Sequence, residues 1–432
     1  MKDASSLAPI PPMSRAARLA VLIAAFAGLV FDGVELGLMP VASLSVSRDL
    51  LDTAYTPTIG GDWFARFTAA LMLGAALGGI VLGSLGDRVG RTRALGISIL
   101  FYSLFAGLGA FVRTQEQMLV LRFLVGLGVG GVWPNAVALV AECWPDKARP
   151  TVAGLMGVAI NTGILLLSQV ARLWPITPDS WRWIFKLAAA PALLGLLVLT
   201  FLPESPKWLA SRAVGPISDG AEEGKRKAGG PLQELFRPPL LRLTVIGILI
   251  GSIPLVGAWA ASKWMIPWAD KVGGATQAGY KALTQGWWAF GAILGSFTGA
   301  QIASLLGRRR AYFLISAGAT VLTISMFQLT APLRPSFHPV VFAQGFVATL
   351  FFGWLPLYLP ELFPTRVRAA GSGLSYNVGR FATAAGVLAA GLLFTAFNGS
   401  YPTVGALAAL IYALGMVVIW WAPDTSRKQL QE

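Results

Sequence analysis

The stretch LAVLIAAFAGLVFDGVELGLMPVA, residues 19–42, decides the fold class of this 432-residue chain. About 20 apolar residues span a bilayer as a helix, and this stretch has that length. It also holds two acids, Asp32 and Glu35, which lie three residues apart and therefore share one face of a helix. An acid at the centre of a membrane helix costs about 2.5–3.5 kcal/mol, so it normally faces a partner or water. The stretch predicts a membrane helix with a functional polar face; simple adhesion between helices is the alternative.

The composition indicates a membrane protein with many spans. Hydrophobic residues make up 55% of the chain and charged residues only 12%, and the mean hydropathy is +0.65. Soluble domains carry about 25% charged residues. The one cysteine and the one histidine exclude an intrachain disulfide and a histidine-rich metal site. No metal-ligand set, nucleophile–base pair or phosphate-binding loop is recognisable, so we expect neither an enzyme nor a cofactor nor a bound metal.

Twelve apolar segments are long enough to cross a bilayer. They fall at 19–42, 64–84, 94–112, 117–141, 150–172, 182–202, 243–268, 283–305, 311–330, 337–359, 370–396 and 402–422. The net charge of +14 comes from Lys and Arg that cluster in loops on the side of the N-terminus. This placement is the orientation signal of a membrane protein and does not indicate a nucleic-acid partner. The positive-inside rule therefore predicts an integral plasma (inner) membrane protein with both termini in the cytoplasm.

An internal repeat divides the chain. Glu142–Arg149 (ECWPDKAR) recurs 219 positions later as Glu361–Arg368 (ELFPTRVR), and both copies fall in predicted cytoplasmic loops. Two halves with the same orientation form a parallel repeat about an axis normal to the membrane. We predict an N-terminal six-helix bundle over 1–202, a Gly-, Lys- and Glu-rich cytoplasmic linker over 203–242, and a C-terminal six-helix bundle over 243–432.

Four motifs resemble those of major facilitator superfamily transporters, and the similarity covers essentially the whole chain. GDRVGR at 86–91 matches the signature loop, and Arg122-x3-Gly126-x-Gly128-x-Gly130 resembles the second motif. PESPKWL at 203–209 resembles the branch of sugar porters and organic-ion carriers, and Asp32-Gly-Val-Glu35 resembles the paired acids of aromatic-acid/proton symporters. The resemblance implies an all-α membrane protein with twelve transmembrane helices in two parallel-repeat six-helix bundles. A central cavity lined by helices 1, 4, 5, 7, 8, 10 and 11 is expected.

Asp32, Glu35 and Arg122 are the candidate residues for proton coupling. Glu35 and Arg122 each lie six or seven residues from the outer end of a predicted helix, so both are about 10 Å deep and can form an ion pair. Movement that separates the pair would favour proton uptake by Glu35, with Asp32 assisting. In the related sugar symporters the acid at this position pairs with this Arg and carries the proton. A permanent structural ion pair is the other interpretation.

Arg380, in the middle of predicted helix 11, is a second buried cation without an acid on its own helix. A guanidinium without an acid suits an anionic ligand, which it can bind with two hydrogen bonds. Pairing with Asp32 or with backbone carbonyls is the alternative. Tyr376 shares the face of Arg380, and Asn377 flanks it.

Three further residues complete the predicted substrate site. Asn161 occupies the position of Arg380 in the other half of the repeat. Trp354 follows Gly353 and precedes Pro356, where regular helix breaks down. Gln169 matches a recurring polar position in sugar porters by resemblance.

The 86–91 loop is expected to act as a gate rather than as a substrate site. The candidate gate residues are Asp87, Arg88, Arg91, Glu142, Arg149, Glu204, Glu361 and Arg368. Their charges could pair across the cytoplasmic face, hold it closed and separate on opening. Ser304 stands where the second copy of the loop would have the counterpart of Asp87, so half of the usual latch is missing.

These features predict a secondary active transporter. We expect symport of a small organic anion, an aromatic or sugar-derived carboxylate, with protons; the proton gradient is the driving force. The partners would be this substrate, protons and the lipid bilayer, with no nucleic acid, and the chain is expected to be a monomer. A carrier of neutral sugars is the main alternative, although it leaves Arg380 unexplained. A cation carrier meets the same objection. Drug/proton antiporters usually carry a Gly-Pro motif in helix 5, which is missing from Gly157–Gly163 here, and a non-transporting receptor is the remaining possibility.

Overall fold

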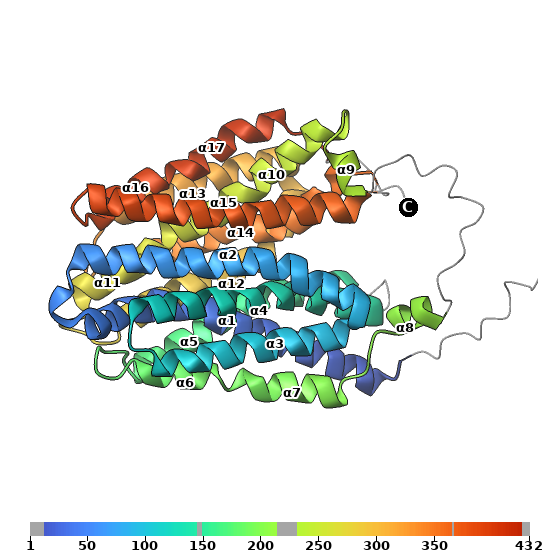
Figure 1. Cartoon of the computed structure of the whole chain (residues 1–432). Helices are drawn as coiled ribbons and strands as arrows, with labels where there is room; N and C mark the ends of the chain where they lie inside the picture. Colours follow the sequence, from blue (N-terminus) through green and yellow to red (C-terminus); the bar gives the residue numbers. More distant parts are fainter. Residues whose placement is uncertain (1–12, 145–148, 214–230, 365–366, 426–432) are drawn as a thin grey trace, which may run out of the picture.

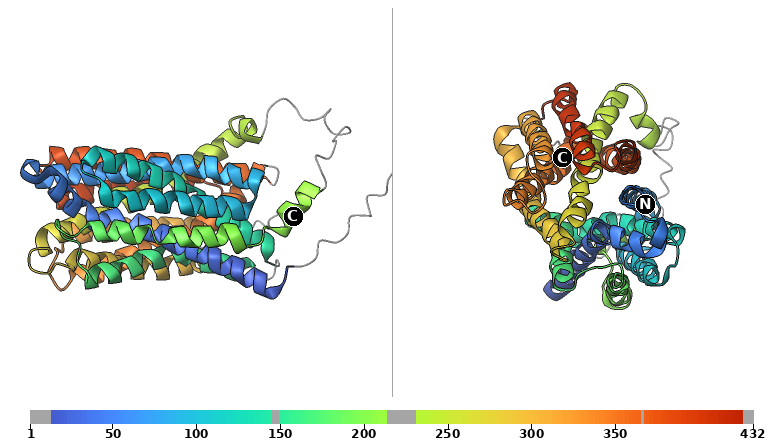
Figure 2. Two further views of the ribbon diagram at one scale, coloured as in Figure 1. Left: turned by 60° about the horizontal axis from the view of Figure 1, so that its bottom comes forward. Right: turned by 90° about the vertical axis from the view of Figure 1, so that its left-hand side faces the viewer.

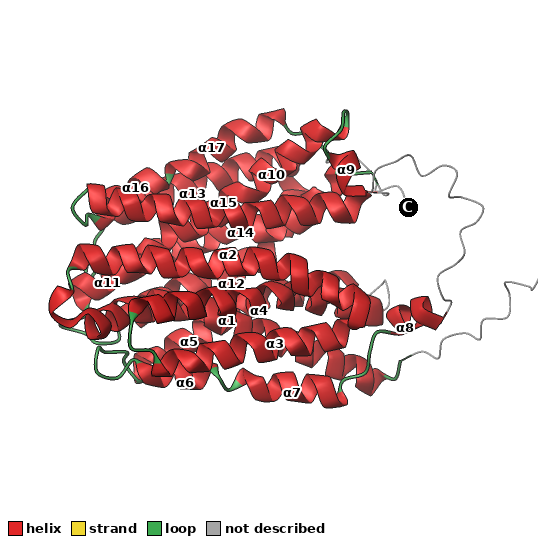
Figure 3. Cartoon of the chain, in the orientation of Figure 1, coloured by secondary structure: helices red, strands yellow, loops and turns green. Residues whose placement is uncertain are grey.

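The computed structural model describes residues 13–144, 149–213, 231–364 and 367–425, and within these ranges the chain is helical without strands (Figure 3). Twelve helical segments of the described chain are long and apolar enough to cross a membrane. The fold class predicted from the sequence, an all-α membrane protein with twelve transmembrane helices, is therefore confirmed.

The N-terminal half contains the first six spans. Their helices are α1 (Arg15–Leu51), α2 (Pro57–Val89), α3 (Arg91–Leu108), α4 (Gln115–Cys143), α5 (Arg149–Leu173), and α6 (Arg182–Ala188) with α7 (Pro191–Phe201). The C-terminal half contains the other six. Their helices are α10 (Leu240–Val256) with α11 (Met265–Gly273), α12 (Tyr280–Leu306), α13 (Arg308–Gln328), α14 (Phe337–Leu362), α15 (Arg368–Ala396), and α16 (Tyr401–Ala408) with α17 (Leu410–Val418).

Several helices extend beyond the apolar runs that predicted them. The first helix continues to Leu51 rather than ending near residue 42, with Pro40 inside it. Polar residues outside a bilayer can stay helical, so an apolar run sets the minimum length of the helix and not its ends. The predicted linker contains two short helices, α8 (Pro206–Ala213) and α9 (Pro231–Leu235), and residues 214–230 lie outside the described chain.

Both ends of the described chain lie at the same end of the helix bundle, which we call the terminal side; the opposite end is the far side (Figures 1 and 2). The two halves meet mainly along α2 with α15 and along α5 with α12, and α1 also packs against α11. Figure 1 shows α2 and α15 side by side along the middle of the molecule. An even number of spans explains why both ends share one side.

Contacts between the halves extend from the far side to the middle of the bundle. On the far side, a Cβ added to Gly61 of α2 would lie 2.1 Å from the Phe394 ring of α15. Near the middle, a Cβ added to Gly79 would lie 3.0 Å from Asn377. Towards the terminal side, a Cβ added to Gly157 of α5 or to Gly373 of α15 would meet nothing within 4 Å.

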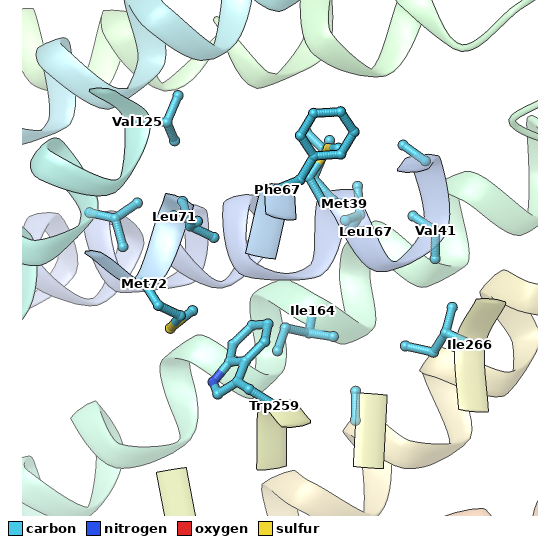
Figure 4. Close-up of a cluster of buried hydrophobic side chains, with 14 of the residues drawn as sticks. Met39, Val41, Phe67, Leu71, Met72, Val125, Ile164, Leu167, Trp259 and Ile266 are labelled. Atoms are coloured by element: carbon cyan, nitrogen blue, oxygen red, sulfur yellow. The ribbon is translucent and has the colours of Figure 1, made fainter. Parts of the chain in front are cut away.

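One apolar cluster connects the halves in the middle. It contains Phe67, Met72 and Ile164 from the N-terminal half and Trp259 from the C-terminal half, all of which Figure 4 labels. A second cluster, which includes Trp354, belongs to the C-terminal half alone. The polar site described next therefore lies within a largely apolar interior.

Candidate functional site

A buried ion pair joins α1 to α4. Arg122 Nη1 donates to Glu35 Oε2 at 3.1 Å, and Arg122 Nη2 donates to the backbone oxygen of Glu35 at 3.3 Å. Each side chain is 1% exposed. Glu35 Oε1 and Arg122 Nε have no hydrogen-bond partner among the described residues. The contact expected from the similar depth of the two residues is present, but it uses only part of the bonding capacity of each group.

Glycines set the positions of these two side chains. A Cβ at Gly33, between the two acids, would lie 1.9 Å from the backbone oxygen of Ile160, so only glycine allows α1 to pack this closely on α5. On α4, a Cβ at Gly128 would lie 2.5 Å from the backbone nitrogen of Tyr102 on α3, and one at Gly130 would lie 2.2 Å from the backbone oxygen of Ala75 on α2. Close packing of small residues is typical of membrane helices.

Asp32 of α1 and Arg380 of α15 interact electrostatically across the two halves. Asp32 is 2% exposed and interacts electrostatically with Arg380 and with Glu35. Its Oδ1 atom has no hydrogen-bond partner among the described residues. Arg380 Nη1 donates to the backbone oxygen of Ala75 on α2 at 2.8 Å, so Arg380 crosses from the C-terminal half to the N-terminal half. Both partners left open by the sequence, Asp32 and a backbone carbonyl, therefore act on Arg380.

Tyr376 and Asn377 lie beside Arg380 as the helical spacing predicted. The Arg380 guanidinium carbon is 5.5 Å from the Tyr376 ring centroid, which is a cation–π contact. Asn377 Oδ1 and Arg380 Nη1 both approach Gly79 of α2. Arg380, Tyr376 and Asn377 are all partly exposed, in contrast to the fully buried Glu35. These three residues are therefore the less buried part of the site.

Asn161 also lies between the halves. Its Nδ2 atom donates to Ser296 Oγ of α12 at 3.0 Å, and the residue is 8% exposed. About three turns along α12 towards the far side, Gln285 Nε2 donates to Ser168 Oγ of α5 at 3.2 Å. Asn161 is therefore a bridge between α5 and α12 in this conformation.

Two predicted substrate residues do not lie beside Arg380. Trp354 is fully buried within the C-terminal half, where it stacks on Tyr358 and donates to the backbone oxygen of Arg308 at 3.0 Å. The prediction that it flanks Arg380 is wrong, because the helix turns this face towards α13 and away from the other half. Gln169 is an exposed side chain near Gly286 of α12, whereas its neighbour Ser168 makes the contact between the halves.

The predicted gate residues on the terminal side form pairs within each half. Arg91 pairs with Asp87 at 2.5 Å and with Glu142 at 3.2 Å. In the C-terminal half Arg308 donates to both oxygens of Glu361, at 3.1 and 2.9 Å. Arg308 and Glu361 repeat the Arg91–Glu142 contact, while Ser304 offers no carboxylate in the place of Asp87.

Glu204 holds the start of α3. It accepts hydrogen bonds from the backbone nitrogen of Thr92 at 3.1 and 3.2 Å, as a carboxylate at a helix N-terminus does. Gly90 has a φ of +112°, and a Cβ there would lie 2.1 Å from Glu204 Oε2, which explains this glycine of the loop. Arg88 and Arg368 lie at the same side of the molecule, and the side chain of Arg149 lies outside the described part of the chain.

The structure adds polar groups that the sequence did not predict as a site. Tyr102, fully buried on α3, interacts electrostatically with both Asp32 and Glu35. On the far side, Lys281 of α12 pairs with Asp270 of α11 at 3.2 Å and donates to Ser45 Oγ of α1 at 2.9 Å, which ties the two halves together. Charged residues near the ends of predicted spans signalled the presence of Lys281 and Asp270, but nothing local indicated their partners.

Comparisons with known proteins agree with this architecture. The model of the Major Facilitator Superfamily matches residues 21–379. The "Cis,cis-muconate transport protein" of Acinetobacter baylyi is 30% identical over 397 residues, 89% of this chain and 92% of that protein. The "Probable 4-methylmuconolactone transporter" of Cupriavidus pinatubonensis is 30% identical over 364 residues, 83% of this chain and 81% of that protein.

Among solved structures, the partially occluded inward open conformation of the xylose transporter XylE from E. coli has a TM-score of 0.74. The identity is 18%, with 96% of this chain and 100% of that chain covered, so the likeness concerns the fold. Members of this family are transporters and not enzymes. The family match over most of the chain, the twelve spans and the two muconate-related relatives lead to one conclusion: the chain belongs to the major facilitator superfamily and is a secondary transporter of small molecules.

Proposed function

We propose that this protein couples the uptake of a small organic acid to the uptake of a proton. The observation that carries the proposal is a set of four charges on α1, α4 and α15: Asp32 and Glu35 are acids, and Arg122 and Arg380 are bases. Their formal charges cancel. An organic anion that binds Arg380 adds one negative charge, and one proton on an acid restores neutrality. Uncompensated charge inside a membrane protein is costly, so anion and proton are expected to bind together.

The incomplete bonding of the acids supports a role in proton transfer rather than a purely structural one. A buried ion pair stabilises a protein only when its remaining lone pairs and protons find partners. Glu35 Oε1 and Asp32 Oδ1 lack such partners among the described residues, and both can accept a proton. When a substrate carboxylate binds the Arg380 guanidinium, Asp32 loses part of the electrostatic stabilisation that Arg380 gives it, and it influences Glu35 through their mutual repulsion. Asp32 assists in this way, while Glu35 carries the driving proton.

The terminal side is proposed to face the cytoplasm, as the positive-inside rule predicts. The far-side contacts, which include Lys281 with Ser45, would then close the outside. Arg91 and Arg308 pair within their own halves, which suits a conformation that opens inwards. Symport of one proton for each negative charge makes accumulation of an anion independent of an inside-negative potential, which otherwise opposes it by about 2.3 kcal/mol per charge per 100 mV.

The test is uptake into proteoliposomes containing the purified protein, with labelled cis,cis-muconate, benzoate and xylose as substrates. An acidic exterior should drive accumulation of an acid and not of the sugar. Arg380→Lys keeps the charge but loses the planar fork, so it should weaken binding of the acids about tenfold or more. Arg66→Lys is the matched control, because Arg66 pairs with Asp62 of its own helix and is half exposed.

Two results would contradict the anion assignment. One is tighter binding of the neutral sugar than of either acid. The other is unchanged binding of the acids by Arg380→Ala. If both occurred together, the protein would be a sugar carrier and Arg380 a structural residue that ties α15 to the carbonyl of Ala75.

A further inference from the structure

Lys263 is a buried cation that the proposed function does not use. It is 1% exposed, and its Nζ atom has no hydrogen-bond partner among the described residues. No acid of the described chain forms an ion pair with it, in contrast to Lys281, which pairs with Asp270. A buried charge without a counter-ion is unfavourable and rarely kept without a reason.

Two tryptophan rings surround the ammonium group. Nζ lies 3.4 Å from the centroid of the Trp288 ring on α12 and 5.8 Å from the centroid of the Trp259 ring. Such cation–π contacts compensate partly for the loss of water. Trp288 is held in place because its Nε1 atom donates to Gln344 Oε1 of α14 at 2.7 Å. The two rings fix the position of the ammonium group and leave its hydrogens available to an anion.

The backbone beneath Lys263 departs from a regular α-helix. Between α10 and α11 the chain forms a π-helical turn over Gly257–Ala261 and a 3-10 turn over Ser262–Trp264. Gln344 Nε2 donates to Ser262 Oγ at 2.6 Å and supports this break from the side of α14. Irregular helix inside a membrane protein is tolerated where it serves a site, and π-turns are frequent at functional positions.

Lys263 lies further towards the far side than Arg380. A Cβ at Gly379 of α15 would contact Leu255, and one at Gly386 would contact Val256 and approach Ala260, so α15 and the Leu240–Gly273 span run in the same direction. By this register Lys263 lies about nine residues beyond the level of Arg380, an axial distance of about 14 Å. Trp259, which lies closer to the terminal side than Lys263, belongs to the apolar cluster that joins the halves (Figure 4).

We propose that Lys263 binds a second anionic group of the substrate, so that the transported acid is a short dicarboxylate. Arg380 holds one carboxylate and Lys263 the other, and the rings of Trp259 and Trp288 flank the far end. The inference rests on the proposed function, because it assumes that Arg380 binds the first carboxylate. It assigns Lys263 to specificity between diacids and monoacids, and not to proton coupling.

The experiment compares binding of cis,cis-muconate, a diacid, with that of benzoate, a monoacid, to the full chain in detergent by calorimetry. Lys263→Met removes the charge and keeps most of the side-chain volume. It should weaken binding of muconate at least tenfold and change binding of benzoate less than threefold. Lys271→Met is the matched control, since Lys271 lies on the same span over the Tyr401 ring but is exposed. It should change neither affinity.

Thermal unfolding of the same variants separates this role from a structural one. An unpaired buried cation does not stabilise the fold, so Lys263→Met should unfold at the same temperature as the wild type or at a higher one. Equal loss of both acids in Lys263→Met, or wild-type binding of muconate, would overturn the assignment while leaving the proposed function in place. A wild-type protein that binds neither acid would overturn the proposed function and this inference together.

Discussion

Replacing Glu35 by Gln tests whether accumulation of the substrate depends on a proton carried by this residue. The change keeps the size of the side chain and an oxygen that can accept from Arg122, but it removes the charge and the titration. At the observed 3.1 Å, the Coulombic attraction between Glu35 and Arg122 is about 5 kcal/mol at an effective dielectric constant of 20. The retained hydrogen bond offsets part of this loss. We therefore expect a folded but less stable protein, with the pair loosened in every conformation.

The effect on transport follows from the coupling. With one proton per substrate anion and the membrane potential clamped at zero, a gradient of one pH unit supplies about 1.36 kcal/mol and drives tenfold accumulation in the wild type. Glu35→Gln should show no accumulation under the same gradient, while exchange of labelled for unlabelled substrate continues. Proteoliposomes with an acidic exterior and a potassium–valinomycin clamp provide the assay. Glu116→Gln, at an exposed position in the first turn of α4, is the control and should accumulate substrate like the wild type. Tenfold accumulation by Glu35→Gln would refute the assignment of the proton to this residue.

Three further predictions follow from packing, from the loop contacts and from topology. Gly33→Ala should lower the free energy of unfolding by about 1–3 kcal/mol, because the new Cβ would lie 1.9 Å from a backbone oxygen of α5. Gly157→Ala should leave it unchanged or raise it, since nothing lies within 4 Å of the new Cβ; equal shifts in the unfolding temperatures of the two variants would contradict the α1–α5 geometry. Asp87→Asn removes a largely exposed ion pair with Arg91, so it should slow turnover in uptake assays with little change in substrate affinity or stability, and a pure loss of affinity would argue against a gate. A cysteine introduced in the predicted linker at 203–242, in a background without Cys143, should react with a membrane-impermeant maleimide only after the cells are opened; labelling of intact cells would place the linker outside.

Much of this fold could be predicted from the sequence, because membrane insertion is decided locally. An apolar run of sufficient length forms a helix in a bilayer whatever lies beside it, since the backbone must satisfy its own hydrogen bonds there. The twelve spans followed from this rule. The similar depth of Glu35 and Arg122 allowed their contact, and the resemblance to sugar symporters favoured it. The grouping of Tyr376 with Arg380 followed from helical spacing.

The tertiary structure decided which faces of the helices meet. The rotation of each helix is set by packing along its whole length, by glycines such as Gly33 and Gly128 that allow close approach, and no short pattern contains that information. For this reason Trp354 points into its own half, although the sequence around it suggested the centre. The same packing pairs Arg308 with Glu361 and joins Asn161 to Ser296. It also places Lys263 against tryptophan rings, with no counter-ion in the described part of the chain. Depth and residue type are local properties of the chain, whereas the partner of a buried polar group depends on segments far away in the sequence.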